Sequence, residues 1–113
     1  MKLSELVQCI DATVLVEGNE DTEISCGYTC DLLSWVMAHG APGMAWVTVQ
    51  THLNVIAVAV LSEMACVILP ENIDMEQESL NKARSEGMAV LKSPLTAYEI
   101  CGRLFAQVIP SES

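Results

Sequence analysis

Residues 47–54 read Val-Thr-Val-Gln-Thr-His-Leu-Asn, and this stretch decides the fold class. An apolar run over 44–49 predicts a strand, because it is rich in residues that favour strands. The run ends at the polar turn 50–52, and an apolar helical pattern begins at Leu53. A strand that leads through a polar turn into a helix is typical of α/β proteins, which commonly bind ligands at the carboxyl ends of their strands.

Strand and helix patterns alternate from this stretch to the C-terminus, and a less regular pattern precedes it. Apolar spacing and turn residues predict helices over 3–10 and 32–37, with strands over 13–16 and 22–26, the second broken by Gly27. Predicted caps are Ser4 for the first helix and Asp31 or Thr29 for the next, which Gly40 ends. The remaining predicted elements are strands 44–49, 65–69 and 88–91, and helices 53–64, 75–86 (cap Asp74, ending before Gly87) and 94–106 (cap Ser93, with Pro94 at its first position).

This order predicts a single α/β domain over 1–113, with a mainly parallel sheet flanked by helices and a frayed tail at 109–113. Helix 53–64 is apolar almost all round, so it must be buried on more than one side. In a chain of 113 residues with 51% hydrophobic residues and a mean hydropathy of +0.37, a partner subunit is the simplest second cover. The sequence therefore predicts a homodimer.

The charge limits the class of partner. The chain carries 15 acidic and 5 basic residues, for a net charge of −10, which argues against binding to nucleic acid or to anionic lipid. No signal peptide or membrane-spanning run is visible, so a cytoplasmic location with reduced thiols is expected. The acidic clusters at 17–23 and 71–78 lack calcium-loop spacing and are expected to be solvated loops.

Three polar loops are expected on one edge of the sheet, since the carboxyl ends of parallel strands share an edge. Helix N-termini there favour anions, so a phosphate- or carboxylate-bearing ligand is a candidate. The alternative is that these side chains are ordinary caps and that the lysine is solvated. The candidate ligand-binding residues are Gln50, Thr51, His52, Asn72, Lys92 and Ser93.

No residue pattern indicates catalysis, a metal or a cofactor. His52 has no Ser or Asp at a spacing that makes a triad recognisable, and the glycine fingerprints of dinucleotide and P-loop sites are missing. The close cysteine pair Cys26 and Cys30 has neither thioredoxin-type nor zinc-type spacing. A redox-sensitive thiol at either position stays open, because both flank an expected turn.

Three segments carry a resemblance to the DRTGG-domain family. They are Asp31-Leu32-Leu33-Ser34-Trp35-Val36-Met37, then 46–59, and Lys92-Ser93-Pro94-Leu95-Thr96-Ala97-Tyr98-Glu99. In particular, the chain is similar to short stand-alone members found beside iron-only hydrogenase components. Gln50-Thr51-His52 stands where the Asp-Arg of the family name falls, and Leu69-Pro70-Glu71-Asn72 stands where Thr-Gly-Gly falls.

The resemblance implies the fold of the N-terminal domain of HPr kinase/phosphorylase, and kinship with the insert between CBS domains of regulated pyrophosphatases. In those proteins the domain is not catalytic and mediates assembly or regulation. The expected function is therefore a non-enzymatic regulatory or assembly module, dimeric, with a nucleotide or phosphorylated metabolite as ligand and a possible redox-enzyme partner in hydrogenase metabolism. The alternatives are a protein-docking accessory subunit without a ligand, and a thiol or iron–sulfur redox protein.

Overall fold

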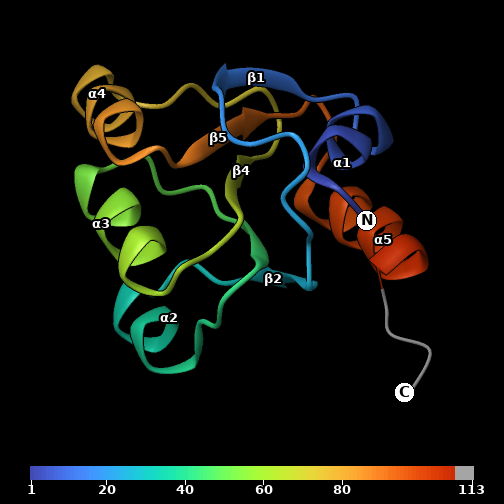
Figure 1. Ribbon diagram of the computed structural model, residues 1–113, viewed down its shortest axis with the longest axis horizontal. Coiled ribbons are helices and arrows are strands. Elements are labelled where there is room, and N and C mark those ends of the chain that lie inside the picture. Colours follow the sequence, from blue (N-terminus) through green and yellow to red (C-terminus); the bar gives the residue numbers. More distant parts are fainter. Residues whose placement is uncertain (109–113) are drawn as a thin grey trace.

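The computed structural model describes residues 1–108, so the predicted frayed tail at 109–113 lies outside the described residues. The described chain folds around one five-stranded sheet (Figure 1). Its strands are β1 (Thr13–Val16), β2 (Cys26–Thr29), β3 (Met44–Val47), β4 (Cys66–Leu69) and β5 (Ala89–Lys92). Its helices are α1 (Leu3–Cys9), α2 (Leu33–His39), α3 (Leu53–Leu61), α4 (Gln77–Glu86) and α5 (Ala97–Val108).

The strand order is β1-β5-β4-β3-β2, and β2 to β5 run parallel to one another. β1 pairs with β5 in the antiparallel direction and forms one edge. Figure 1 shows α2, α3 and α4 on one face of the sheet, and α1 and α5 on the other. The predicted architecture, a mainly parallel sheet flanked by helices, is confirmed.

The central strand β4 serves two hydrophobic cores. Val67 and Leu69 belong to the core on the side of α2, α3 and α4, whereas Cys66 and Ile68 belong to the core on the side of α1 and α5. All four residues are buried, because successive side chains of a strand point to opposite faces and both faces are covered. The continuous apolar run in the sequence has this physical origin.

The strand predicted over 22–26, with a break at Gly27, is wrong. β2 lies at Cys26–Thr29, and Gly27 is inside it, paired with Ala45 of β3. A Cβ atom at Gly27 would lie 3.1 Å from Leu104 Cδ1, so the missing side chain lets α5 pack closely against this strand. Glycine here serves helix–strand packing rather than a turn.

The start of the last helix also differs from the prediction. α5 begins at Ala97, so Ser93 is not its cap and Pro94 is not its first residue. Thr96 caps the N-terminus of α5 instead. Glu99 N–H donates to Thr96 Oγ1 at 3.1 Å, and Thr96 N–H donates to Glu99 Oε1 at 2.9 Å. This reciprocal capping box satisfies two amides, and its hydrogen bonds lower the pKa of the Glu99 carboxyl.

Three more predicted caps are wrong. The N-cap positions are Lys2 for α1, Leu32 for α2 and Glu76 for α4, in place of Ser4, of Asp31 or Thr29, and of Asp74. The Asp31 and Asp74 carboxylates instead bind groups elsewhere in the chain. The predicted helix ends are better: Gly40 and Gly87 both follow a helix, and Gly87 has the left-handed φ of 71° that favours glycine.

The apolar helix α3 lies between α2 and α4 against the sheet (Figure 1). Val55, Ile56 and Ala59 are buried completely, whereas Leu61 is 72% exposed. Burial on more than one side is thus supplied within the chain, by the two neighbouring helices. No described helix has the length and apolar composition needed to cross a bilayer.

Candidate functional site

The loops that follow β2, β3, β4 and β5 gather at one edge of the sheet, because these four strands are parallel. We call this region the carboxyl edge and define it as residues 30–32, 48–52, 70–76 and 92–96. It contains all six candidate ligand-binding residues. Five of the six side chains have partners within the chain, and Asn72 is bonded through its backbone amide.

Asp31 joins the first two loops. Its Oδ1 atom accepts hydrogen bonds from Thr48 Oγ1 at 2.7 Å and from the backbone amide of Val49 at 3.0 Å. The side-chain amide of Gln50 donates to the backbone carbonyl of Asp31. From the sequence, Asp31 is predicted as one of two candidate helix caps, and this role is not predicted, since nothing local links an aspartate to a threonine that lies 17 residues later.

Thr51 and His52 hold the beginning of α3 and its neighbour α4. Thr51 Oγ1 donates to Glu76 Oε2 at 3.2 Å, and the Thr51 carbonyl accepts from the buried Ser79 Oγ at 2.7 Å. His52 Nδ1 accepts from the Asn54 amide at 3.1 Å and caps α3. This bond requires an unprotonated Nδ1, so the neutral ring carries its proton on Nε2.

Lys92 and Ser93 lie at the end of β5. The Lys92 ammonium contacts Asp74 Oδ1 at 2.7 Å. Ser93 is completely buried: its hydroxyl donates to the Ile10 carbonyl at 2.6 Å and accepts from the Leu95 amide at 3.1 Å. The Ser93 side chain therefore connects β5 to the end of α1 and does not face solvent.

Asn72 lies on the loop after β4 in a left-handed conformation, with a φ of 57°. The backbone amide of Asn72 donates to the Ser93 carbonyl at 2.9 Å, and this bond joins the loop after β4 to the loop after β5. The same loop supplies Asp74 to Lys92 and Glu76 to Thr51. The segment 70–76 thus brings the two halves of the candidate site together.

The electrostatics of the carboxyl edge differ from those of a ready anion site. Asp31, Glu71, Asp74 and Glu76 place carboxylates on these loops, against the single ammonium of Lys92. Because Lys92 is already paired with Asp74, an incoming phosphate has to replace that carboxylate or be repelled by it. The geometry permits ligand exchange at Lys92 but provides no free cation among the described residues of this edge.

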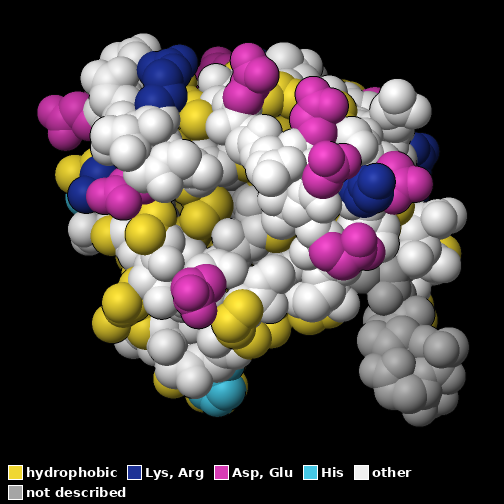
Figure 2. All heavy atoms as spheres, viewed as in Figure 1, with side chains coloured by type: hydrophobic (Ala, Val, Ile, Leu, Met, Phe, Trp, Pro, Cys, Tyr) yellow, Lys and Arg dark blue, Asp and Glu magenta, His cyan; other side chains and the backbone are white. Residues whose placement is uncertain are grey.

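Exposed apolar side chains lie on α2 and α3 and on the adjoining loops of this edge. Figure 2 shows hydrophobic side chains gathered over α2 and α3. Trp35 is 52% exposed, and its ring stacks on His39 with 4.0 Å between the ring centroids. We call this set the α2–α3 surface. Its members are Leu32, Trp35, Met37, Val49 and Leu61.

The cysteines do not form a cluster that could hold a metal. All five thiols are free, and the described residues contain no group of three or more His, Cys, Asp or Glu side chains placed around a common metal position. Burial raises the pKa of Cys66 to about 12 and also raises the pKa of Cys101. These two thiols are therefore poor sources of thiolate, which is the reactive form.

A comparison with solved structures finds a protein of the same fold. It is the crystal structure of the CBS and DRTGG domains of the regulatory region of Clostridium perfringens pyrophosphatase, complexed with its activator, diadenosine tetraphosphate. The TM-score is 0.71 at 12% sequence identity, over 96% of this chain and 47% of that chain. This chain shares the fold of the part of the solved chain on which it superposes. It spans about half the length of the solved chain, and no protein-family model and no curated protein matches its sequence.

Proposed function

We propose that the chain is a non-catalytic, cytoplasmic regulatory or assembly module that forms a homodimer through the α2–α3 surface. The observation that carries this proposal is the exposure of Leu32 at 61%, Trp35 at 52% and Leu61 at 72% on one helical layer. Tryptophan and methionine are enriched in protein interfaces, and buried aromatic anchors supply most of the binding energy there. The regulatory role is supported by the likeness in fold to a regulatory region.

The dimer is tested by light scattering at micromolar concentration. The wild type is expected at twice the chain mass of 12.2 kDa. A double variant, Leu32→Ser with Trp35→Ser, is expected to weaken dimerisation by at least about 30-fold, since the loss of even one interface anchor costs at least ~2 kcal/mol. Serine leaves the net charge unchanged, so a change in long-range repulsion does not contribute.

The matched control replaces two exposed aromatic residues on α5, Tyr98→Ser with Phe105→Ser. These side chains are 88% and 67% exposed and lie on the opposite face of the sheet. The control is expected to leave the dimer intact. A monomeric wild type contradicts the proposal. Dissociation of the α5 variant alone would also contradict it, because that result would place the interface on the opposite face of the sheet.

We further propose that the carboxyl edge binds a small anionic ligand, a nucleotide or a phosphorylated metabolite, through Gln50, Thr51, His52, Asn72 and Lys92, with Ser93 supporting the loop from inside. The solved regulatory region was crystallised with a nucleotide activator, which supports a search for this class. The pairing of Lys92 with Asp74 predicts the direction of one effect. Because the Asp74 carboxylate competes with the ligand for the ammonium, removing its charge should strengthen ligand binding.

Thermal denaturation with ADP, ATP and diadenosine tetraphosphate tests this ligand. A saturating ligand at about 100 times its Kd adds ~2.7 kcal/mol to the stability, which raises Tm by several degrees. Thr51→Ala with Lys92→Ala is expected to remove the shift, whereas Asp74→Asn is expected to increase it by freeing the ammonium. Lys82→Ala on α4 is the matched lysine control. A shift that persists in the Thr51 and Lys92 double variant, or none with any of the three nucleotides, contradicts the site.

The redox-enzyme partner and the link to hydrogenase metabolism rest on the sequence resemblance alone. They stay proposals, and they are tested by binding of the purified module to a purified hydrogenase component. A ligand-free docking subunit would bind that component but show no nucleotide shift. The two experiments together therefore separate a ligand sensor from a docking protein.

A further inference from the structure

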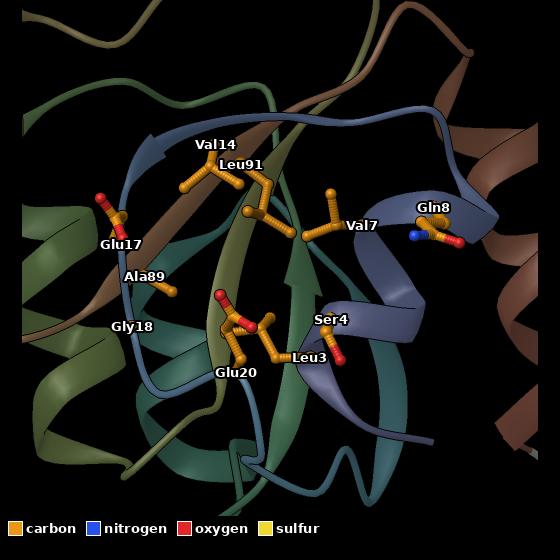
Figure 3. Close-up of a pocket in the computed structure, with 10 residues that line it drawn as sticks. All are labelled: Leu3, Ser4, Val7, Gln8, Val14, Glu17, Gly18, Glu20, Ala89 and Leu91. Carbon is orange, nitrogen blue, oxygen red and sulfur yellow. The ribbon is translucent and has the colours of Figure 1, made fainter.

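A cavity of about 380 Å³ lies between α1, β1, β5 and the loop that follows β1, away from the carboxyl edge. Figure 3 shows its lining residues arranged around an open centre. Its volume falls in the range of small-molecule sites, about 300–1,000 Å³. Apolar side chains from three elements form most of its lining: Leu3, Val7, Val14, Ala89 and Leu91.

The cavity exists because the helix on this part of the sheet is short. α1 has only seven residues, and Val14 on the edge strand β1 is left 42% exposed, opposite Leu91 of β5. The loop after β1 closes another side. Gly18 lies so close to β5 that a Cβ atom there would be 2.8 Å from the Cβ of Ala89, so glycine lets the backbone form this wall.

The polar groups at the cavity carry negative charge. In Figure 3 the carboxylate of Glu20 points over the centre of the cavity, and Glu17 lies at its rim. Neither carboxylate has a hydrogen-bond or ion-pair partner in the described part of the chain. Ser4 and Gln8 of α1 also line the cavity. Figure 2 shows acidic side chains gathered over this part of the surface.

We propose that this cavity binds a small organic amine, with its apolar body on the floor and its ammonium group at Glu20. A cation bound there gains a charge-assisted hydrogen bond, and the apolar floor removes the rest of the ligand from water. Glu17 and Glu20 are exposed to solvent, so they remain charged and disfavour an anion at this position. The site is separate from the carboxyl edge and does not depend on its ligand.

A second copy of the chain does not supply the cation. Four of the five basic side chains already contact a carboxylate. Arg84 contacts Asn81 instead. The ion pairs are Lys2 with Asp21, Lys82 with Glu86, Lys92 with Asp74, and Arg103 with Asp11.

Nuclear magnetic resonance titration with three probes of similar body tests the proposal: phenethylamine, phenethyl alcohol and phenylacetate. The amine is expected to shift the backbone amides of Val7, Gly18 and Ala89, and to bind about two- to fivefold more tightly than the alcohol, because an exposed ion pair is worth up to ~1 kcal/mol. Phenylacetate is expected not to bind. Raising the salt concentration should weaken binding of the amine, since salt screens the attraction between exposed charges.

Two variants separate the contribution of the Glu20 charge to binding from the contribution of the cavity's shape. Glu20→Gln is expected to reduce amine binding to the level of the alcohol, and Val14→Phe, which fills the cavity from an exposed edge position, is expected to abolish binding of both. Glu78→Gln on α4 removes a distant carboxylate and is the matched control. Equal binding of amine and alcohol, an unchanged affinity in Glu20→Gln, or shifts confined to residues outside the cavity would each overturn the proposal.

Discussion

Replacing Trp46 with alanine is expected to lower the free energy of unfolding by about 3–5 kcal/mol. Trp46 is completely buried in β3, where its ring packs into the core on the side of α2, α3 and α4. Its indole N–H donates to the Cys30 carbonyl at 2.9 Å. The substitution therefore opens a large cavity and leaves a part-buried carbonyl without its donor, next to the loop that carries Asp31.

Urea denaturation followed by circular dichroism measures this loss, and Trp46→Phe divides it into two parts. Phenylalanine keeps most of the ring volume but cannot donate to Cys30, so a loss of about 1–2 kcal/mol is expected. Trp35→Phe is the matched control, because Trp35 is 52% exposed, and it should change stability by less than ~0.5 kcal/mol. A loss below about 1 kcal/mol for Trp46→Ala would contradict the packing described for β3.

Replacing Ser93 with alanine is expected to cost about 2–4 kcal/mol, because two backbone groups lose their partner at once. The hydroxyl donates to the carbonyl of Ile10, which lies 83 residues earlier, and accepts from the Leu95 amide. Water cannot replace these bonds easily at a residue with no exposed surface. The hydroxyl thus holds the end of α1 against the carboxyl edge.

The same variant tests whether Ser93 supports the proposed site or contacts the ligand. Ser93→Ala should lower Tm and leave the nucleotide-dependent rise in Tm unchanged. Ser85→Ala on α4 removes an exposed hydroxyl that donates to the Lys82 carbonyl, and it should be nearly neutral. Unchanged stability of Ser93→Ala together with a lost ligand response would show that the serine acts on the ligand directly.

Much of the fold was predictable because its signal is local. Runs of apolar residues marked β3, β4 and β5, and the spacing of leucines marked α1, since a buried strand or a packed helix face needs these patterns wherever it lies. β2 was the exception. β2 is an edge strand that pairs on one side only. Its four residues Cys26–Thr29 contain a glycine and two half-exposed side chains, so the sequence has no apolar run that indicates this strand.

The position of the candidate site was also predictable, but the state of its side chains was not. A strand, a polar turn and a helix place Gln50, Thr51 and His52 at the carboxyl edge whatever the partners are. That Thr51 meets Glu76, and that Lys92 meets Asp74 rather than a free anion, depends on a loop that follows another strand. Any ligand proposed for this edge therefore has to compete with the Glu76 and Asp74 carboxylates.

The sequence by itself determined the kinds of elements, their order and the two-sided burial of the sheet, because hydrophobic periodicity records which faces of each element are removed from water. Only the tertiary structure decided what each polar side chain does. Ser93, Asp31 and Asp74 could all cap the helix that follows, and each is a sound local prediction. Each binds a group far away in the sequence instead, since a hydrogen bond goes to the partner that folding brings within about 3 Å, and that partner is set by how the strands and helices pack.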